Sequence, residues 1–461
     1  MIQEDTISAV ATALGEGGIG IIRLSGTKAV EIAAGIFRGA HGKTVQDIAS
    51  HQAAYGHIID PAGNQMIDEV LLLVMRAPRS YTREDVVEIH CHGGPVPVRK
   101  ILALTLAAGA RLAEPGEFTK RAFLNGRLDL TQAEAVIDVI RAKTDASLKM
   151  AAGNLSGKLA DKIHMLRNHI LEMIAHLEAA IDFPEDDIEE LAAEDVERRV
   201  KKIGSEVEEL LAGAHTGRIL RDGLETVIIG KPNVGKSSLL NVLLKETRAI
   251  VTDVPGTTRD SIEEYANIGG VPLKIIDTAG IRETRDTVEK IGVEKSKSLI
   301  QRADLVLLVL DSSSPLTHED QAVLELLTGC QTLVLVNKSD LNPVLDLDRV
   351  MNLLPGKKLL KISILEGTGL EELEQYIIDM VYGGQIQLPE SGFVNNVRQA
   401  DLLVKVNQSL REVLTTIAAG MPPDCIVVDL RSAWEQLGRI TGDTIDEDII
   451  DQIFTQFCIG K

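Results

Sequence analysis

Residues 230–238 read G-K-P-N-V-G-K-S-S and match the phosphate-loop spacing G-x-x-x-x-G-K-[ST]. They follow the apolar run 227–229 and lead into an apolar helical pattern that begins at Leu239. A strand, a glycine-rich turn and a helix are therefore predicted in the order that a phosphate cradle needs, because backbone N–H groups and the positive end of the helix face the anion. Lys236 adds a positive charge to this loop, and Ser237 is the expected ligand of Mg²⁺.

Three further segments complete a nucleotide site. Residues 277–280 read D-T-A-G after the apolar run 273–276, so Asp277 is expected to orient the Mg²⁺ shell and a glycine N–H to meet the γ-phosphate. Residues 256–260, G-T-T-R-D, offer a threonine to the metal. Residues 337–340 read N-K-S-D, and their acidic side chain can accept the ring N–H and the exocyclic amine of guanine. Adenine lacks that pair of donors, so the sequence predicts GTP rather than ATP.

The position that follows D-T-A-G is informative. Small GTPases carry a glutamine there that positions the attacking water, whereas this chain has Ile281. An isoleucine side chain neither donates nor accepts a hydrogen bond, so the water must be oriented from elsewhere. Glu283, Asp286 and Glu289 lie just beyond. The sequence identifies no arginine finger, so another cation must stabilise the negative charge of the transition state.

Composition limits the class of protein. The 461 residues carry 48 basic and 68 acidic side chains, a net charge of −20, with 44% hydrophobic and 3% aromatic residues. This net negative charge argues against extensive, sequence-independent binding of a nucleic-acid backbone. Any RNA contact must therefore use a local basic patch or the surface of a partner. The four scattered cysteines contain no C-x-x-C pair, and no apolar run is long enough for a membrane span. A soluble, cytoplasmic protein is expected.

The chain is long enough for about three domains. Residues 1–125 show short strand-like runs between turns, such as 6–13, 19–24 and 70–75, and predict an α+β domain. Residues 126–220 and 385–461 are helical in pattern, and 221–384 contain the nucleotide motifs. Neither helical stretch makes a complete bundle alone. We therefore expect them to fold together as one discontinuous helical domain with a Ras-like α/β nucleotide domain inserted between them.

The helical stretches have defined predicted elements. Apolar residues recur at three- and four-residue steps from Leu159 to Ile181, and Pro184 ends that helix. The next helix is predicted to run through 196–211 and to end near Gly213 and Gly217. Later helices are expected around 397–418, 425–441 and 446–457.

Two clusters mark the first domain: Y-T-R-E-D-V-V-E-I-H-C-H-G-G-P at 81–95 and P-G-E-F-T-K-R-A-F-L-N-G-R-L-D-L at 115–130. His90, Cys91 and His92 could ligate a metal, but strand alternation places the two histidines on one face and the cysteine on the other. With no further ligand nearby, a packed strand end is the favoured interpretation.

The whole chain resembles the MnmE (TrmE) family of tRNA-modifying GTPases. The phosphate loop alone is shared with related GTPases such as Era and Der. The resemblance to MnmE depends on A-I-V-T-D-V-P-G-T-T-R-D from Ala249, D-T-A-G-I-R-E-T-R-D-T-V-E-K-I-G from Asp277, H-G-G-P, P-G-E-F-T-x-R-A-F-L-N and the terminal F-C-I-G-K. It implies an N-terminal tetrahydrofolate-binding-like domain that mediates homodimerisation, and G domains that dimerise across the nucleotide with K⁺ in place of an arginine finger.

The resemblance also implies site residues. K⁺ would be held by Asn233, Thr252, Val254 and Thr257, and Mg²⁺ by Ser237 and Thr258. Glu289 would orient the water, although a solvated surface carboxylate is the alternative for it. The implied GTP contacts are Asn233, Val234, Gly235, Lys236, Ser237, Ser238, Thr252, Asp253, Val254, Pro255, Gly256, Thr257, Asp277, Thr278, Ala279, Gly280, Asn337, Lys338 and Asp340.

A folate site is implied at Arg23, Glu88, Arg127 and Lys461 for 5,10-methylene-tetrahydrofolate, with 5-formyl-tetrahydrofolate as its analogue. A carboxylate suits the amide and amidine edge of a pterin, and cations suit the glutamate tail. Cys458 could act as a nucleophile or acid/base, and a small buried residue is an equal alternative. Residues 362–365, I-S-I-L, depart from the family's S-A-[KR] loop behind guanine.

The family implies a function. With the FAD-dependent partner MnmG (GidA), in a heterotetramer or larger complex, the protein would add an aminomethyl-type group at C5 of the wobble uridine of certain tRNAs. An Era/Der-like assembly GTPase without group transfer is one alternative. A folate-dependent aminomethyl transferase with a regulatory GTPase is another.

Overall fold

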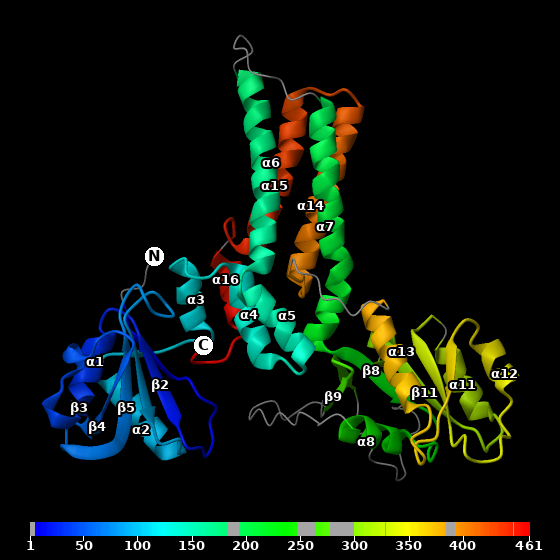
Figure 1. Cartoon of the computed structure of the whole chain (residues 1–461), viewed down its shortest axis with the longest axis horizontal. Coiled ribbons are helices and arrows are strands. Elements are labelled where there is room, and N and C mark those ends of the chain that lie inside the picture. Colours follow the sequence, from blue (N-terminus) through cyan, green and yellow to red (C-terminus); the bar gives the residue numbers. More distant parts are fainter. Residues whose placement is uncertain are drawn as a thin grey trace. The chain divides into compact units, whose positions relative to one another are not determined.

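The computed structural model describes residues 5–182, 193–246, 264–276, 299–327, 329–383, 392–445 and 447–461. The chain forms two compact units, Met1–Ile137 with Gly438–Lys461 and Asp138–Leu437. Each unit has its own sheet. The first and last segments of the chain therefore belong to one unit (Figure 1).

The first unit contains a seven-stranded sheet in the order β3-β4-β5-β6-β2-β1-β7. Neighbouring strands are antiparallel except β1 and β7, which are parallel. The strands are β1 (Ile7–Val10), β2 (Gly20–Ser25), β3 (Phe37–Gly39), β4 (Gln52–Asp60), β5 (Gln65–Met75), β6 (Val86–Cys91) and β7 (Arg111–Leu112). The helices are α1 (Ala29–Ile36), α2 (Pro95–Ala107), α3 (Glu117–Leu124), the first part of α4 (Leu130–Arg141), and α16 (Glu447–Phe454).

Strand alternation divides this sheet into two faces. Ile22, Ile89 and Cys91 belong to a core shared with α1 and α2, whereas Ile7 and Phe118 form a smaller core with α3. Because side chains alternate along a strand, Arg23 in β2 and Glu88 in β6 project on the α3 side, and they are paired in register. The sheet thus carries a polar pair beside an apolar helix face.

His90 in β6 and His92 just after it bind separate carboxylates. His90 Nε2 lies 3.2 Å from a Glu88 oxygen, and His92 Nδ1 lies 2.7 Å from an Asp68 oxygen. Cys91 is buried on the opposite face, where burial raises the pKa of its thiol to about 11. No group of three or more His, Cys, Asp or Glu side chains suited to a metal ion occurs among the described residues.

The second unit joins long helices to a six-stranded sheet in the order β13-β12-β11-β8-β10-β9. All pairs are parallel except the edge strand β9. The strands are β8 (Leu224–Ile229), β9 (Glu264–Ile268), β10 (Val271–Ile275), β11 (Leu305–Asp311), β12 (Thr332–Asn337) and β13 (Lys358–Lys361). They are accompanied by α8 (Lys236–Glu246), α11 (His318–Leu326), α12 (Leu347–Leu353) and α13 (Leu370–Tyr382). Alternate residues of β11 enter cores on opposite faces, as expected for a sheet covered on both sides.

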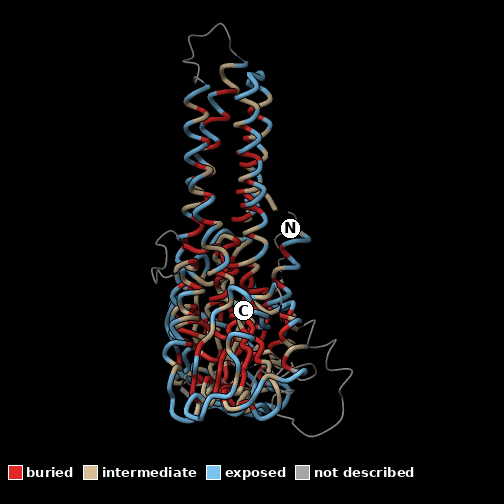
Figure 2. The backbone as a smooth tube through the Cα atoms, turned by 90° about the vertical axis from the view of Figure 1, so that its right-hand side faces the viewer, coloured by how far each residue is buried: buried red, intermediate tan, exposed pale blue. Residues whose placement is uncertain are grey.

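The helical part contains α5 (Asp145–Leu155), α6 (Lys158–Asp182), α7 (Ala193–Asp222), α14 (Val397–Ala418) and most of α15 (Pro423–Thr441). The buried residues of α6 recur at the predicted spacing from Leu159 to Leu177, and buried positions lie on the inner sides of the long helices (Figure 2). Helices α7 and α14 pack together although the sheet lies between them in the sequence.

The predicted end of α7 is wrong. The helix continues past Gly213 and Gly217 to Asp222 and leads directly into β8. A side-chain Cβ at Gly217 would lie 2.2 Å from the Val394 carbonyl oxygen, so this glycine is needed for close approach of another segment rather than for termination. Tertiary packing therefore outweighs the roughly 1 kcal/mol that glycine costs inside a helix.

Candidate nucleotide and one-carbon sites

The phosphate loop connects β8 to α8 at the carboxyl edge of the sheet, where ligands bind in open α/β folds. Gly235 has φ 108°, and a Cβ there would lie 2.2 Å from the Asn337 side-chain nitrogen. Asn233 also has a positive φ, 65°. The backbone of the loop therefore has a conformation that ordinary side chains rarely adopt, with the last glycine closed against a second motif.

Lys236 is held over its own loop. Its ammonium donates to the carbonyl oxygens of Gly230 at 2.8 Å and Lys231 at 2.5 Å. Burial lowers the pKa of this ammonium. Lys231 in turn pairs with Asp320 of α11 at 2.5 Å. The positive charge of Lys236, which a nucleotide phosphate requires, is thus already held against the phosphate loop.

The predicted guanine motif is joined to the phosphate loop and to residues 362–365. The buried Asn337 donates from Nδ2 to the Val234 carbonyl at 2.8 Å, and its Oδ1 accepts from the Ile364 N–H at 3.2 Å. Ser363 donates to an exposed Asp340 carboxylate at 2.6 Å. Leu365 is 89% exposed. Residues 362–365 depart from the family's loop sequence, yet they keep a backbone contact with Asn337 and a serine that orients the Asp340 carboxylate.

Lys338 of the same motif pairs with Asp311 at the end of β11, with 2.5 Å between Nζ and Oδ2. Burial raises the pKa of the Asp311 carboxyl, but hydrogen bonds from Lys338 and Ser313 outweigh it, so the pKa lies below its usual range. Two neighbouring parallel strands are therefore tied together by an ion pair directly beside the expected base site.

Several predicted residues lie outside the described residues. These are the loop that contains Thr252, Asp253, Val254, Pro255, Gly256, Thr257 and Thr258, the motif Asp277, Thr278, Ala279 and Gly280, and Ile281 and Glu289. The roles of these residues stay predictions, as do those of Asn233 as a K⁺ ligand and Ser237 as a Mg²⁺ ligand.

The predicted folate residues converge in the first unit. The Arg23 guanidinium pairs with Glu88, with 2.8 Å between Nε and Oε1, and donates to the Gly460 carbonyl at 3.1 Å. Gly460 has φ 91°, and a Cβ there would lie 2.2 Å from the Val10 carbonyl oxygen. The C-terminal segment is therefore bound closely along β1 and β2.

Lys461 belongs to the same group of charges. Burial, followed by the charge of Arg23, lowers the pKa of its ammonium, and Glu88 and Cys458 act in the opposite direction. Cys458 is exposed, so the alternative that it is a small buried residue is wrong. Its carbonyl accepts from the N–H groups of Gly116 at 3.3 Å and Lys461 at 3.3 Å, which holds this part of the backbone in place. Four of the five predicted residues of this region, Arg23, Glu88, Cys458 and Lys461, thus lie together in one small assembly.

Arg127 is joined to this assembly through Tyr81, which the sequence analysis did not single out. The guanidinium carbons of Arg127 and Arg23 lie 4.6 Å and 5.9 Å from the centre of the Tyr81 ring. Phe118, fully buried, has Arg23 5.7 Å from its ring centre. The only sequence signal was that both aromatic residues fall within the two clusters at 81–95 and 115–130.

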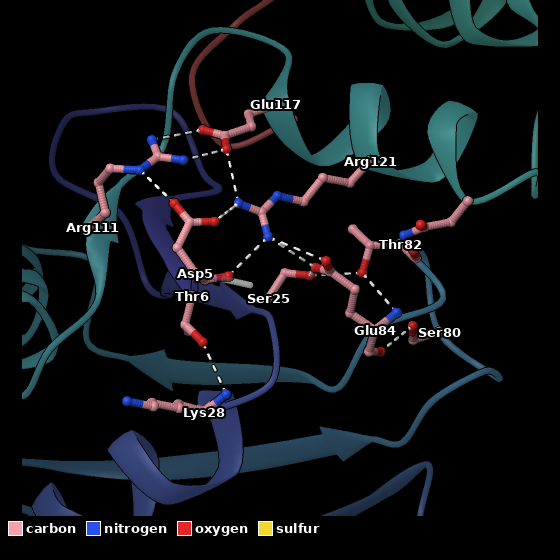
Figure 3. Close-up of polar contacts among 11 residues, drawn as sticks. Asp5, Thr6, Ser25, Lys28, Ser80, Thr82, Glu84, Arg111, Glu117 and Arg121 are labelled. Carbon is pink, nitrogen blue, oxygen red and sulfur yellow. Dashed lines mark hydrogen bonds and ion pairs between the residues drawn. The ribbon is translucent and has the colours of Figure 1, made fainter. Parts of the chain in front are cut away.

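A network of charged side chains holds these clusters together (Figure 3). The carboxylate of Glu117 accepts from Arg111 at 2.6 Å and from Arg121 at 2.9 Å. Arg121 also reaches Asp5 at 2.6 Å and Glu84 at 3.2 Å. Helix α3 is thereby fixed to the segment before β1, to β7 and to the loop that carries Tyr81.

Comparison with known proteins gives matches along the full chain. Residues 6–127 match the family described as "GTP-binding protein TrmE N-terminus", and residues 130–458 match the "MnmE helical domain". The tRNA modification GTPase MnmE of Geobacillus kaustophilus is 54% identical over 462 residues, with 100% of both chains covered. That of Bacillus subtilis is 49% identical, covering 99% of this chain and 100% of the relative. The chain belongs to the MnmE family of tRNA modification GTPases.

Membership of the MnmE family confirms the predicted combination of a TrmE-type N-terminal domain, a helical domain and a phosphate-loop GTPase domain. A solved structure of the G domain of the T. maritima FeoB iron transporter also matches, at 27% identity and a TM-score of 0.26, covering 34% of this chain and 97% of that one. None of the described helices is long and apolar enough to cross a membrane.

Proposed function

We propose that this chain is a K⁺-dependent GTPase that modifies the wobble uridine of certain tRNAs. With the FAD-dependent partner MnmG (GidA), in a heterotetramer or larger complex, it adds a carboxymethylaminomethyl or aminomethyl group at C5. The carbon comes from 5,10-methylene-tetrahydrofolate. The proposal is supported by relatives named tRNA modification GTPases that match over the full length.

The observation that carries it is the assembly of Arg23, Glu88 and Lys461 beside Tyr81. A GTPase switch alone does not need a carboxylate, two cations and aromatic faces in a second unit of the chain. These groups suit a folate: the carboxylate accepts from a pterin edge, the aromatic rings pack on it, and the cations bind the acidic tail. A bound folate would supply the one-carbon unit, while these side chains bind and orient it.

The nucleotide side of the proposal rests on the phosphate loop and the guanine motif. Asp340, oriented by Ser363, accepts from guanine, and Lys236 neutralises phosphate charge. Asn233 contributes a side-chain amide to the sequence of the loop, and an amide oxygen is the kind of ligand that suits K⁺. Thr252, Val254 and Thr257 would complete that K⁺ site, Ser237 and Thr258 would hold Mg²⁺, and Glu289 would orient the water. GTP hydrolysis would drive opening and closing of paired G domains in a cytoplasmic homodimer.

The domain organisation is part of the proposal. Residues 1–125 form the folate-binding-like dimerisation domain, 126–220 and 385–461 form the discontinuous helical domain, and 221–384 form the inserted G domain. Packing of α7 on α14 supports the insertion. Limited proteolysis near Gly223 and Gly384 should release the middle fragment and leave the outer two associated.

The monovalent cation tests the GTPase side directly. Hydrolysis by the full-length chain should be well below the K⁺ rate when Na⁺ replaces K⁺ at equal ionic strength, because the smaller ion does not complete the same oxygen cage. Equal rates in the two salts would exclude the K⁺ role. An Era/Der-like switch without group transfer would instead be indicated by wobble uridines that stay modified in cells that lack this protein.

A further inference from the structure

Two segments of the first unit are joined at the surface by a set of reciprocal hydrogen bonds. The side chain of Asn125 donates to the Thr82 carbonyl at 2.6 Å, and Arg83 donates back to the Asn125 carbonyl at 2.8 Å. Arg127 donates to the Tyr81 carbonyl at 3.1 Å. The loop between β5 and β6 and the turn after α3 therefore hold two arginines, Arg83 and Arg127, beside each other.

Hydrogen bonds of the two residues that flank Arg83 hold its loop in place. Thr82 is fully buried, its hydroxyl lies 2.6 Å from that of Ser25, and Glu84 binds both Ser25 and Arg121 (Figure 3). Arg83 itself is exposed and has φ 60°, a backbone conformation that non-glycine residues adopt rarely. The arginine is thus displayed on a rigid support and does not belong to the buried network.

A cavity of about 540 Å³ opens beside this pair. Arg127 forms part of its wall, together with apolar side chains that include Phe123, Leu124 and Ile445 and the carboxylates of Asp129 and Asp443. The volume lies within the range of roughly 300–1,000 Å³ that is typical of small-ligand sites. Apolar walls, a guanidinium and carboxylates suit a planar group that has both N–H donors and carbonyl acceptors.

Charge makes this surface distinctive. The chain carries a net charge of −20, yet Arg79, Arg83 and Arg127 are all exposed along one short loop and the adjoining turn. A guanidinium has five N–H donors, and Arg83 and Arg127 each place one nitrogen on a carbonyl. Donors that point away from those carbonyls are suited to a phosphate. This is the local basic patch that an acidic protein needs in order to bind RNA.

We propose that the cavity binds one nucleotide of single-stranded RNA, with its base against Phe123 and Leu124 and its phosphate on Arg83. The proposal rests on the proposed tRNA function and assigns the site where the substrate nucleotide enters. RNA loops are recognised through splayed bases that pack on aromatic or arginine planes and bond through their edges. A uracil suits the wall, because its imide N–H can be accepted by a carboxylate and its carbonyl oxygens can accept from Arg127. Tyr81 links Arg127 to Arg23, so the base would lie next to the one-carbon group.

The phosphate contact is tested by titrating the full-length chain with a fluorescent anticodon stem-loop that carries uridine at the wobble position. Arg83→Ala should weaken binding by about 5-fold and reduce the slope of log K against log salt by about 0.7, the value for one phosphate contact on a single strand. Arg99→Ala removes the same charge from an exposed position of α2 and should leave both quantities unchanged. Equal effects of the two variants would overturn the proposal.

The base contact is tested by photo-crosslinking with 4-thiouridine at the wobble position. Crosslinked peptides should contain residues 81–83, 123–132 or 441–450. Leu124→Glu should abolish the crosslink, because it replaces the apolar surface on which the base packs with a charged side chain. Leu112→Glu, at a similarly exposed leucine outside the cavity wall, should retain it. Crosslinks confined to other peptides would exclude the cavity.

A third measurement separates RNA from the acidic tail of a folate. Affinity for 5-formyl-tetrahydrofolate should be the same in wild type and Arg83→Ala; if the variant loses folate affinity and keeps RNA affinity, the arginine binds the tail and the proposal fails. The RNA titration needs neither GTP nor folate. Failure of the proposed function, seen as no wobble-uridine product with the wild-type complex, is therefore distinguishable from failure of this site.

Discussion

The nucleotide loop and the one-carbon assembly differ in how far apart along the chain their residues lie. The phosphate loop is a contiguous segment whose lysine bonds to carbonyls five and six residues away. The one-carbon assembly joins Arg23 to Gly460, 437 residues apart, and depends on α3 to hold the C-terminal segment. A contiguous motif carries its own geometry, whereas the dispersed site exists only when the first unit has folded. The two sites should therefore respond to different substitutions.

The largest expected effect separates the two chemistries. Lys236→Ala should reduce GTP hydrolysis by a factor on the order of 100 or more, because a preorganised charge at the phosphates is lost. Affinity for 5-formyl-tetrahydrofolate, measured by calorimetry on the same sample, should not change. Lys361→Ala, on the exposed side of β13, is the matched control and should hydrolyse GTP normally. A concurrent loss of folate affinity in Lys236→Ala would mean that the sites are not separable.

The buried charge network should make the first unit sensitive to acid. Burial raises the pKa of the Glu117 carboxyl, but hydrogen bonds from Arg111 and Arg121 outweigh it and hold the pKa below the ordinary 4.5. The native state then binds fewer protons than the unfolded state, so this stabilisation is present above pH 4.5 and is lost as pH falls through the native pKa.

Glu117→Gln should therefore destabilise the first unit by about 3 kcal/mol at neutral pH, because two arginines lose a buried partner. The variant should also lose less stability than wild type on acidification below pH 4.5. Calorimetric unfolding of the full chain at several pH values measures both, with the exposed Glu114→Gln as control. An unchanged pH profile in Glu117→Gln would contradict the assigned role of the network.

A substitution in the C-terminal segment should weaken folate binding at the one-carbon assembly. Gly460→Ala places a methyl group on a residue with φ 91° against the Val10 carbonyl, so the terminal segment must move away from Arg23. Folate affinity should fall by about 10-fold, equivalent to roughly 1.4 kcal/mol, with GTP hydrolysis unchanged. Gly35→Ala, which adds a methyl group to open space in α1, should behave as wild type. Normal folate binding by Gly460→Ala would remove the C-terminal segment from the site.

The smallest effect concerns base recognition. Ser363→Ala removes the hydroxyl that bonds to Asp340 and should weaken GTP binding by about 5-fold, in line with roughly 1 kcal/mol for such a bond. Inosine triphosphate lacks the exocyclic amine of guanine, so its affinity should fall less. Fluorescence competition gives both values. Equal losses for the two nucleotides would mean that Ser363 supports the loop and does not orient the carboxylate.

The same contrast explains what the sequence could predict. The phosphate loop, the N-K-S-D motif and the apolar spacing of α6 are local patterns, and the structure places them as expected. The predicted end of α7 was wrong. Gly217 is a glycine because Val394 packs closely against it, and that contact cannot be read from the local sequence. Arg23, Glu88 and Lys461 were named only through family resemblance. Tyr81, Phe118 and the Glu117–Arg121 network were missed, since their roles arise from strand register and helix packing.

The central claim is that GTP hydrolysis in one unit serves group transfer in the other. The most direct measurement is mass spectrometry of wobble nucleosides after reaction of the purified chain with its FAD-dependent partner, GTP, methylene-tetrahydrofolate and unmodified tRNA. The account predicts a modified wobble uridine with wild type, and none with either Lys236→Ala or Arg23→Gln, although each variant retains the other ligand. Full modification by either variant, or unmodified uridine with wild type, would contradict it.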